Sequence, residues 1–424
     1  MILRASADGE GELGCAGRAG GSARNRGKNR GKNRDKGEPM TGRLAGVAWI
    51  VLLSAGEVFA GELSVLLGEA PLNLEFHEPP PAELLADHAA GGDSYRAAVP
   101  LPRARVAGPT WTSETVFDVL FLERNNATDN QPIVLDGPLG PNPDSPVFTT
   151  RGMVFATAPG LRLFHGRRDC DGDGWELGYW GVFGMFGDHR ADLPGGLAIP
   201  GDLGLAVPGW QTAESIEAGY SSALNVVELN LFASDQWNTT TSNPRDPSHH
   251  VHRSTTVDWI GGLFWAGVDE TAFLRVTAEP GEPSTAYRVA TSSNLFGAQV
   301  GVRGRRQWGL WALEGFWKLG LGGSWLHQST SPITSSLVPD FEYRPGRSAA
   351  TTNTGFLSSM NVTAVRPIGE HWSLRAGYNL AWLSGLALAP NQFDFTDTLT
   401  SGTGIEGAGS MFLAGASLGL ERRW

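Results

Sequence analysis

Three short segments carry side chains whose types and spacing could support chemistry, and the first is Asp169-Cys-Asp-Gly-Asp-Gly174. Its alternating carboxylates and glycines match the first six positions of a calcium-binding loop, in which acidic side chains converge on the ion around a tight turn. Such a loop closes with a bidentate Glu, which here would fall at position 180, and that residue is Trp180. We therefore expect a tight hairpin turn and no metal site.

The other two segments are a histidine run and a serine beside a histidine. The imidazoles of His249-His-Val-His252 could bind Zn²⁺ or Ni²⁺, but the segment is polar and has Pro244 and Pro247 next to it, which favours a solvated loop. Ser373 and His371 share one face of a predicted strand, yet the chain has no Gly-x-Ser-x-Gly nucleophile elbow. The sequence therefore predicts no enzyme, no metal and no cofactor, and an outer-membrane enzyme of the lipase type, with Ser373 and His371 on the barrel wall, is the weaker alternative.

The amino-terminal 110 residues fall into three segments that differ in amino-acid composition. Residues 1–39 mix Gly, Arg, Lys and Asn without hydrophobic periodicity, so we expect a non-native or disordered extension. Residues 40–60 have the form of a signal peptide: Arg43, the apolar run Leu44–Ala55 and the small-x-small site Val58-Phe-Ala60. Residues 61–110 are rich in Pro and Ala and are expected to be a linker or periplasmic extension.

Net charge and cysteine content exclude several classes of function. The chain has 33 basic and 44 acidic residues, and removal of residues 1–60, which hold 10 and 6, leaves a net charge of −15. An acidic chain of this kind lacks the electrostatic footprint of a protein that binds nucleic acid. Cys170 would then be the single cysteine, so neither a disulfide framework nor a cysteine-based zinc site is expected.

From Trp111 to Trp424 the chain consists of blocks of about ten residues that alternate apolar with polar or small side chains. No apolar run reaches the about 18 residues of a spanning helix, so a membrane would have to be crossed by strands. In His371–Ser384, one face carries Trp372, Leu374, Ala376, Tyr378, Leu380 and Trp382. The two Trp residues are about 34 Å apart along a strand, or about 24 Å along the membrane normal at a tilt near 45°, which matches an apolar band of about 25 Å with aromatic edges.

The last block also alternates and ends on Trp424, an aromatic carboxy terminus of the kind that barrel assembly machinery recognises in outer-membrane barrels. Eleven blocks have this pattern, and an even number is usual, so we expect an all-β, antiparallel transmembrane barrel of about 12 strands, with 10 as the alternative. The nine other blocks are Thr115–Arg124, Leu161–Arg168, Trp175–Phe186, Ser221–Ala233, Val257–Gly267, Thr271–Ala278, Tyr287–Val302, Trp308–Leu319 and Thr354–Arg366. Outer loops are expected at 125–150, 188–215, 235–253 and 328–350, and periplasmic turns at 171–174 and 367–370.

Several short motifs resemble those of the β-barrel porin 7 family of outer-membrane barrels. They are Phe121-Leu-Glu-Arg124, Gly174-Trp-Glu-Leu177, Val227-Glu-Leu-Asn230, Tyr287-Arg-Val, Asn294-Leu-Phe-Gly-Ala-Gln-Val-Gly301, and Ala376-Gly-Tyr378 through Ala387-Leu-Ala-Pro-Asn-Gln392. The resemblance spans Trp111 to Trp424. It implies a barrel and a bacterial outer-membrane location, with outer-membrane lipid as surroundings, and it supplies no catalytic residue. Phe232-Ala-Ser departs from the basic continuation expected after Glu-Leu-Asn.

The strand phases predict a polar interior that could line a pore. The residues projected inward are Glu228, Asn230, Gln299, Arg303, Glu314, Lys318, Arg375, Glu421 and Arg423, while Trp372, Trp382 and Trp424 are projected onto an outer aromatic girdle. Interior charges must be paired or wetted. Their mixed signs fit a passive diffusion channel for small solutes, the favoured hypothesis, or a closed barrel that serves as a structural or surface-anchor protein.

Overall fold

The computed structural model divides the chain into two units, Met1–Thr110 and Trp111–Trp424. It describes residues 111–138, 142, 144–169, 172–243, 246–278, 284–334 and 341–424, and within these not the side chains of 236–243 and 246–253. The extension, signal peptide and linker expected over 1–110, and the His249–His252 side chains, lie outside the described part. No helix in the described residues is long and apolar enough to cross a membrane.

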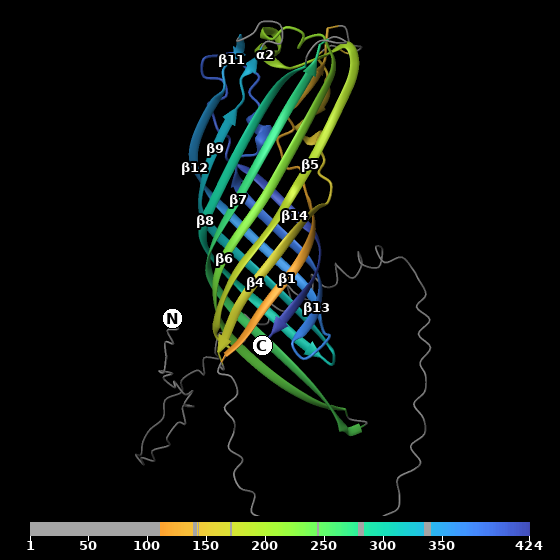
Figure 1. The fold of residues 1–424 in the computed structure, drawn as a ribbon, viewed down its shortest axis with the longest axis vertical. Helices are drawn as coiled ribbons and strands as arrows, with labels where there is room; N and C mark the ends of the chain where they lie inside the picture. The colour runs from red at the N-terminus through yellow and green to blue at the C-terminus, as the bar shows by residue number, and fades with distance from the viewer. Residues whose placement is uncertain are drawn as a thin grey trace, which may run out of the picture. The chain divides into compact units, whose positions relative to one another are not determined.

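In the second unit, ten antiparallel strands close into a ring (Figure 1). Each strand pairs with its neighbour along the ring, and the first and last strands pair from Glu114↔Arg423 to Arg124↔Leu413. The barrel predicted from the alternation is thereby confirmed. Its strands are β1 (Trp111–Arg124), β4 (Ala158–Asp169), β5 (Gly174–Ala198), β6 (Ala213–Asn243), β7 (Asp246–Thr277), β8 (Thr285–Trp308), β9 (Trp311–Thr330), β12 (Arg347–Pro367), β13 (Trp372–Leu386) and β14 (Gly409–Arg423).

The strand number is the lower of the two expected, because two predicted blocks form one strand. Asp269 and Glu270 resemble a turn in the sequence, but β7 runs through them without interruption and pairs with β6 and β8 on either side. Asp269 faces outward and is exposed, whereas Glu270 faces inward and is buried. β2 (Pro132–Asp136) and β3 (Pro146–Thr149) add to the far end of β5, so the sheet as a whole has 12 strands.

The two ends of the barrel differ in their connections. One end holds the carboxy terminus and short connections between β4 and β5, β8 and β9, and β12 and β13; we call it the periplasmic end, since outer-membrane barrels have short turns there. The other, extracellular, end holds the long loops with β2, β3, α2 (Gly201–Ala206), and the pair β10 (Ile333–Thr334) and β11 (Glu342–Arg344).

The prediction of an outer loop over residues 235–253 is wrong. This segment is the β6–β7 hairpin, and it projects from the periplasmic end (Figure 1, green). The segment lacks an alternating apolar face, so the sequence pattern gives no strand signal. Its run Thr239-Thr-Thr241 nevertheless has the β-branched side chains that favour extended backbone.

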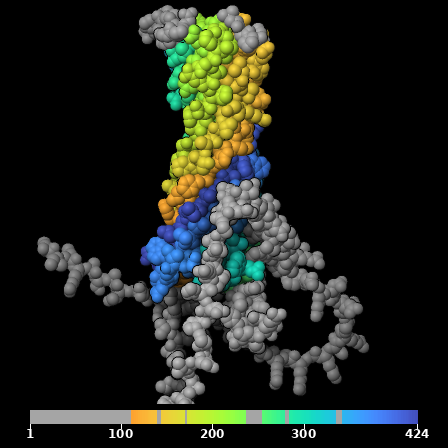
Figure 2. All heavy atoms as spheres, turned by 90° about the vertical axis from the view of Figure 1, so that its right-hand side faces the viewer, coloured from red at the N-terminus to blue at the C-terminus, as the bar shows by residue number. Residues whose placement is uncertain are grey.

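The outer wall is apolar over the middle of the barrel and aromatic at both edges of that zone. Exposed large apolar residues alternate with buried interior ones on nine of the ten ring strands, as in Phe117, Val119 and Phe121 of β1. On β12 the outward side chains Phe356, Met360 and Val362 are partly buried. Trp372, Trp382 and Trp424 are each 45–48% exposed on this outer surface. A continuous apolar exterior of this kind is a membrane-facing surface. Figure 2 shows the wall from the side, with the first strands (orange) directly beside the last ones (blue).

Candidate functional site

The interior of the barrel contains the nine residues that the sequence projects inward. Seven of them are buried: Glu228, Asn230, Gln299, Glu314, Lys318, Arg375 and Glu421. Arg303 and Arg423 are partly buried near the periplasmic mouth. All nine face inward, and their interactions divide them between two clusters.

The first cluster, here the periplasmic network, is centred on Arg375 of β13. The Arg375 guanidinium lies 2.5 Å from Glu421 and 3.0 Å from Glu314, with Asp118 at 3.6 Å. Asp118 also accepts hydrogen bonds from Arg162 at 2.5 and 2.8 Å. β1, β4, β9, β13 and β14 each contribute one of these side chains, so the network crosses the lumen.

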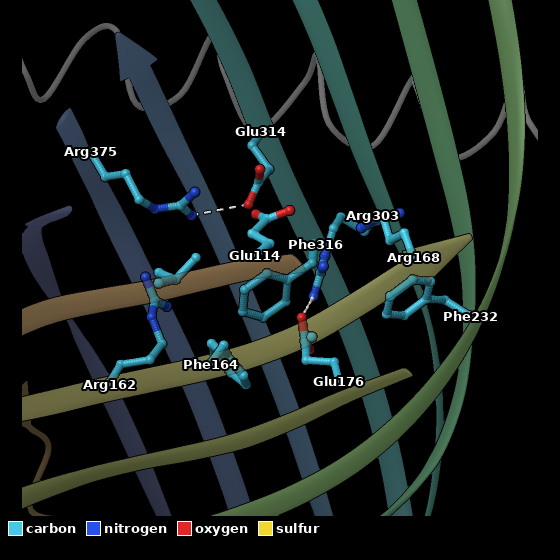
Figure 3. A pocket seen from close by; sticks show the side chains of 12 residues that line it. Glu114, Arg162, Phe164, Arg168, Glu176, Phe232, Arg303, Glu314, Phe316 and Arg375 are labelled. Atoms are coloured by element: carbon cyan, nitrogen blue, oxygen red, sulfur yellow. Dashed lines mark hydrogen bonds and ion pairs between the residues drawn. The ribbon is translucent and has the colours of Figure 1, made fainter. Parts of the chain in front are cut away.

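The same network continues towards the mouth through further ion pairs. Arg303 lies 2.6 Å from Glu176, and Arg168 lies 2.8 Å from Asp258. Figure 3 shows the Arg375–Glu314 and Arg303–Glu176 pairs pointing into one space, with aromatic rings between them. The ring of Phe232 lies 4.3 Å from the Arg168 guanidinium. Arginine stacking of this kind lets an apolar ring fill space between charges.

Four more ion pairs complete the network: Arg305 with Glu314 and with Glu421, and Arg423 with Glu114 and with Glu421. Every arginine of the network therefore has a carboxylate partner, so the signs balance. Pairing and hydrogen bonds offset the free-energy cost of removing these charges from water.

The second cluster, the middle cluster, lies further inward and is built around Glu228. Its carboxylate forms an ion pair with Lys318 and accepts hydrogen bonds from Trp180 Nε1 at 3.1 Å and Gln299 Nε2 at 3.0 Å. Asn230 donates to Glu228 at 3.1 Å and accepts from Gln299 at 2.6 Å. These side chains come from β5, β6, β8 and β9, so they form a layer across the lumen.

A third group, the upper cluster, was not predicted from the sequence. Arg124 lies 2.6 Å from Glu270 and donates to the Tyr220 hydroxyl at 2.6 Å, and that hydroxyl donates to Glu270 at 2.8 Å. Glu270 lies between the predicted blocks Val257–Gly267 and Thr271–Ala278, and Arg124 is the last residue of its predicted block. The phase of β1, in which Asp118, Leu120, Leu122 and Arg124 alternate inward, would have revealed Arg124.

The β13–β14 connection folds back into the extracellular end of the lumen, and we call its buried part, Ala387–Phe395, the loop plug. The Ala389 N–H donates to Glu270 at 2.9 Å, and the Ala387 N–H donates to Ser293 at 3.0 Å. Phe393 and Phe395 stack 5.9 Å apart, and Phe393 lies 5.3 Å from the Tyr287 ring. The plug is thus joined to the wall by both hydrogen bonds and apolar packing.

Two acidic groups on the extracellular loops have shifted pKa values. Burial raises the pKa of Glu406, and the charge of Asp129 and a hydrogen bond shared with it raise that pKa further. Burial would also raise the pKa of Asp394, but hydrogen bonds from Thr396 and Gly402 and the charge of Arg344 outweigh it and lower that pKa. In the described residues no group of three or more His, Cys, Asp or Glu is placed to hold a metal ion.

Very little open space remains between these clusters. The cavities inside the lumen measure about 20 and 30 Å³, whereas one water requires about 10 to 15 Å³ on the same scale. A larger hollow of about 330 Å³, lined by residues such as Arg305, Asp258 and Arg423, opens at the periplasmic mouth. The described lumen is therefore a charged vestibule that leads to a filled barrel.

No protein-family model matches the chain, and no curated protein matches it. Solved structures with a similar fold include the outer membrane protease OmpT from Escherichia coli, at 11% identity over 74% of this chain and 97% of that one, with a TM-score of 0.40. A Pseudomonas aeruginosa FadL homologue has 11% identity over 74% and 90%, with a TM-score of 0.20. A porin has 10% identity over 74% and 100%, with a TM-score of 0.15.

These neighbours are bacterial outer-membrane β-barrels. Their identities and TM-scores are too low for the likeness to support a conclusion about this chain. The assignment of this chain to the outer membrane depends on its closed ring of strands and on its apolar outer wall with aromatic edges. Strands can cross a membrane only as a closed barrel, and membrane-spanning barrels have an exterior of this kind. The chain is therefore an outer-membrane β-barrel.

Proposed function

We propose that the protein is a closed barrel that acts as a structural or surface-anchor protein and presents its extracellular loops to a partner. The observation that carries this proposal is the filled lumen: the periplasmic network, the middle cluster and the loop plug follow one another along the axis, with cavities of only about 20 and 30 Å³ between them. A permanently open channel would need a continuous wet path.

The extracellular end supports an anchoring role because it is built as a small ordered domain. Trp210, Ile199 and Leu203 are fully buried there, as are Ile133 and Met153. The Trp210 indole N–H donates to Thr285 at 2.7 Å, which ties the α2 segment to β8. Loops with a packed core of their own can display a fixed surface, which is what recognition of a partner requires.

A diffusion channel for small solutes is the second candidate, and the periplasmic vestibule of about 330 Å³ favours it. Conduction would require the side chains of the middle cluster to move apart and the loop plug to leave the lumen. The sequence resemblance to the β-barrel porin 7 family favours this channel function, and membership of the chain in that family is a proposal. We propose no reaction for the chain, since the likeness to the protease OmpT is one of fold and carries no site residues.

Planar-bilayer recording of the refolded wild-type protein and of Arg375→Glu separates the two candidates. Arg375 contacts Glu421 and Glu314, so the closed barrel predicts background conductance for both proteins and a large loss of stability in the variant. Arg288→Glu is the control, because Arg288 is exposed and faces outward from β8. Unitary wild-type currents whose reversal potential shifts towards cation selectivity in Arg375→Glu would contradict the closed barrel and support the channel.

A further inference from the structure

The outer wall has a hollow of about 300 Å³ where β13, β14 and β1 run side by side. Phe121, Tyr378 and Phe412 form its sides, and Ala414 is among the small residues of its floor. Glu123 also lines it. The hollow is separate from the lumen and from the clusters described above, because these residues belong to the outward phase of their strands.

The strand register explains why a hollow forms here. Ala414 pairs with Glu123 on one side and with Leu380 on the other, and the next outward residue, Ala416, pairs with Phe121 and Tyr378. Two alanines therefore stand between larger side chains on both flanks. Gly415 lets the strands approach, since a Cβ there would lie 2.0 Å from the Phe121 carbonyl oxygen.

The same strand register gives the position of the hollow along the membrane normal. Asn125 meets Phe412 through a backbone hydrogen bond of 3.0 Å, and Phe412 pairs with Trp382 at the extracellular aromatic edge. Glu123 and Ala414 lie just inside this edge, towards the apolar zone. The hollow is thus placed where a lipid headgroup meets its hydrocarbon chain.

The carboxylate of Glu123 is exposed, and no hydrogen bond or ion pair to it is found among the described residues. An unpaired anion at the margin of the hydrocarbon zone is unfavourable, and a cation would neutralise it. The faces of aromatic rings also attract cations, and aromatic rings are used to recognise quaternary ammonium ligands. Carboxylate and rings together therefore select positive charge, whereas phosphate or sulfate would be repelled.

We propose that this hollow binds the ammonium headgroup of an amphiphile, with the ammonium against Glu123 and the aromatic rings and the hydrocarbon chain along the β13–β14 wall. The wall supplies Leu380 and Leu418 for the chain, and Leu418 is 57% exposed. The proposal does not depend on whether the lumen is open or closed. An ammonium-bearing membrane lipid and a cationic amphiphile from outside present the same chemistry.

The first experiment titrates the folded full chain, in a neutral maltoside detergent, with dodecyltrimethylammonium or dodecyl sulfate by isothermal calorimetry. Saturable binding is expected for the cationic probe alone. Glu123→Gln should weaken it about tenfold or more, as expected for loss of one charge contact in a partly dehydrated site. Ala414→Phe should abolish it by filling the hollow. Asp269→Asn, which removes another exposed outward carboxylate, should leave it unchanged.

Native mass spectrometry of the barrel released from nanodiscs then distinguishes a membrane lipid from an external amphiphile as the source of the ammonium ligand. If the wild-type barrel retains phosphatidylethanolamine in preference to phosphatidylglycerol, and Glu123→Gln loses this preference, the ligand is a membrane lipid. If the barrel binds the cationic probe but retains no lipid, the ligand is an external amphiphile. Equal affinity of wild type and Glu123→Gln, or equal binding of the anionic probe, overturns the proposal. Folding of each variant is checked by heat-modifiable gel mobility, and the Glu123→Gln result stands alone if Ala414→Phe does not fold.

Discussion

Lys318 and Glu228 show how single side chains close the lumen. Both are almost completely shielded from solvent, with side-chain exposures of 2% and 0%. Trp180, Gln299 and Asn230 satisfy the remaining oxygen lone pairs of Glu228. Such a pair contributes little net stability when it is complete, but it is costly to break, because removal of one partner leaves a buried charge.

Lys318→Met should therefore destabilise the folded barrel by about 3 to 5 kcal/mol. The Glu228 carboxylate would keep its hydrogen bonds but lose its counter-charge. The double variant Lys318→Met, Glu228→Leu should recover most of the loss, since no buried charge remains. Urea unfolding followed by Trp fluorescence measures both values, and a double variant that is as unstable as the single one would argue against a paired charge as the cause.

Glu406 gives a prediction about pH at the extracellular surface. Its pKa is raised by burial and by Asp129, so ionisation of Glu406 costs more in the folded loops than in the unfolded chain. Loop stability should therefore be greater at acidic pH and should fall as pH rises from the ordinary pKa of Glu through the raised value. Glu406→Gln should remove this dependence.

Hydrogen exchange of the β13–β14 loop between pH 4 and 7 checks the prediction, with intrinsic exchange rates taken into account. Glu370→Gln serves as the control, because Glu370 is an exposed carboxylate in the turn at the opposite end of the barrel. A loop whose protection changes with pH equally in wild type and in Glu406→Gln would rule out Glu406 as the responsible group.

At the scale of elements, neighbouring strands approach closely where glycine faces the lumen. A Cβ on Gly262 of β7 would lie 2.4 Å from both the Leu229 carbonyl oxygen and the Asn230 side chain, which belongs to the middle cluster. Its chain neighbour Gly261 faces outward, and a Cβ there would meet nothing within 4 Å. One strand therefore offers a test position and its own control.

Gly262→Ala should cost about 1 to 3 kcal/mol, the usual range for overpacking of a filled interior. Gly261→Ala should change stability by no more than about 0.5 kcal/mol, as at an unstrained surface position. Denaturant midpoints of the two variants give the comparison. Equal effects would mean that the close approach of β6 and β7 is not what requires glycine at position 262.

At the scale of the whole molecule, the two aromatic edges define how the barrel spans the membrane. On the periplasmic side, the Arg422 guanidinium lies 5.5 Å from the Trp372 ring and 5.1 Å from the Trp424 ring. On the extracellular side, Trp382 packs edge-on against Phe356 at 5.3 Å. The edges are joined by β13, so one strand carries a reporter at each interface.

Trp372 and Trp382 should consequently report opposite interfaces in lipid. Single-Trp variants that retain one or the other should both be quenched best by shallow quenchers, and a water-soluble quencher enclosed in vesicles should reach one of the two only. Strand-rich circular dichroism and heat-modifiable mobility verify that the variants fold. Quenching that places both residues at the same interface would contradict the orientation of β13.

Much of the barrel follows from local sequence pattern. Side chains alternate across a strand with a period of two, so Arg375 between Leu374 and Ala376 faces the lumen whichever strands flank it. The aromatic residues Trp372 and Trp382 likewise mark the ends of the lipid-facing stretch. The inward phase of all nine predicted interior residues, the position of the turns at 171–174 and 367–370, and the antiparallel barrel itself were therefore accessible from the sequence.

The tertiary structure decided which strands close the ring, which interior side chains pair with one another, and whether the lumen is filled. All three depend on contacts between residues far apart in the chain. The inward position of Glu270 could have been inferred once β7 was known to be continuous, but its pairing with Arg124 depends on where the ring closes. The motif Ala387-Leu-Ala-Pro-Asn-Gln392 carries no period, so its pattern did not show that it enters the lumen. Alternation determines which face a side chain occupies, whereas strand register and loop packing determine what it meets there, and that difference separates an open pore from a closed barrel.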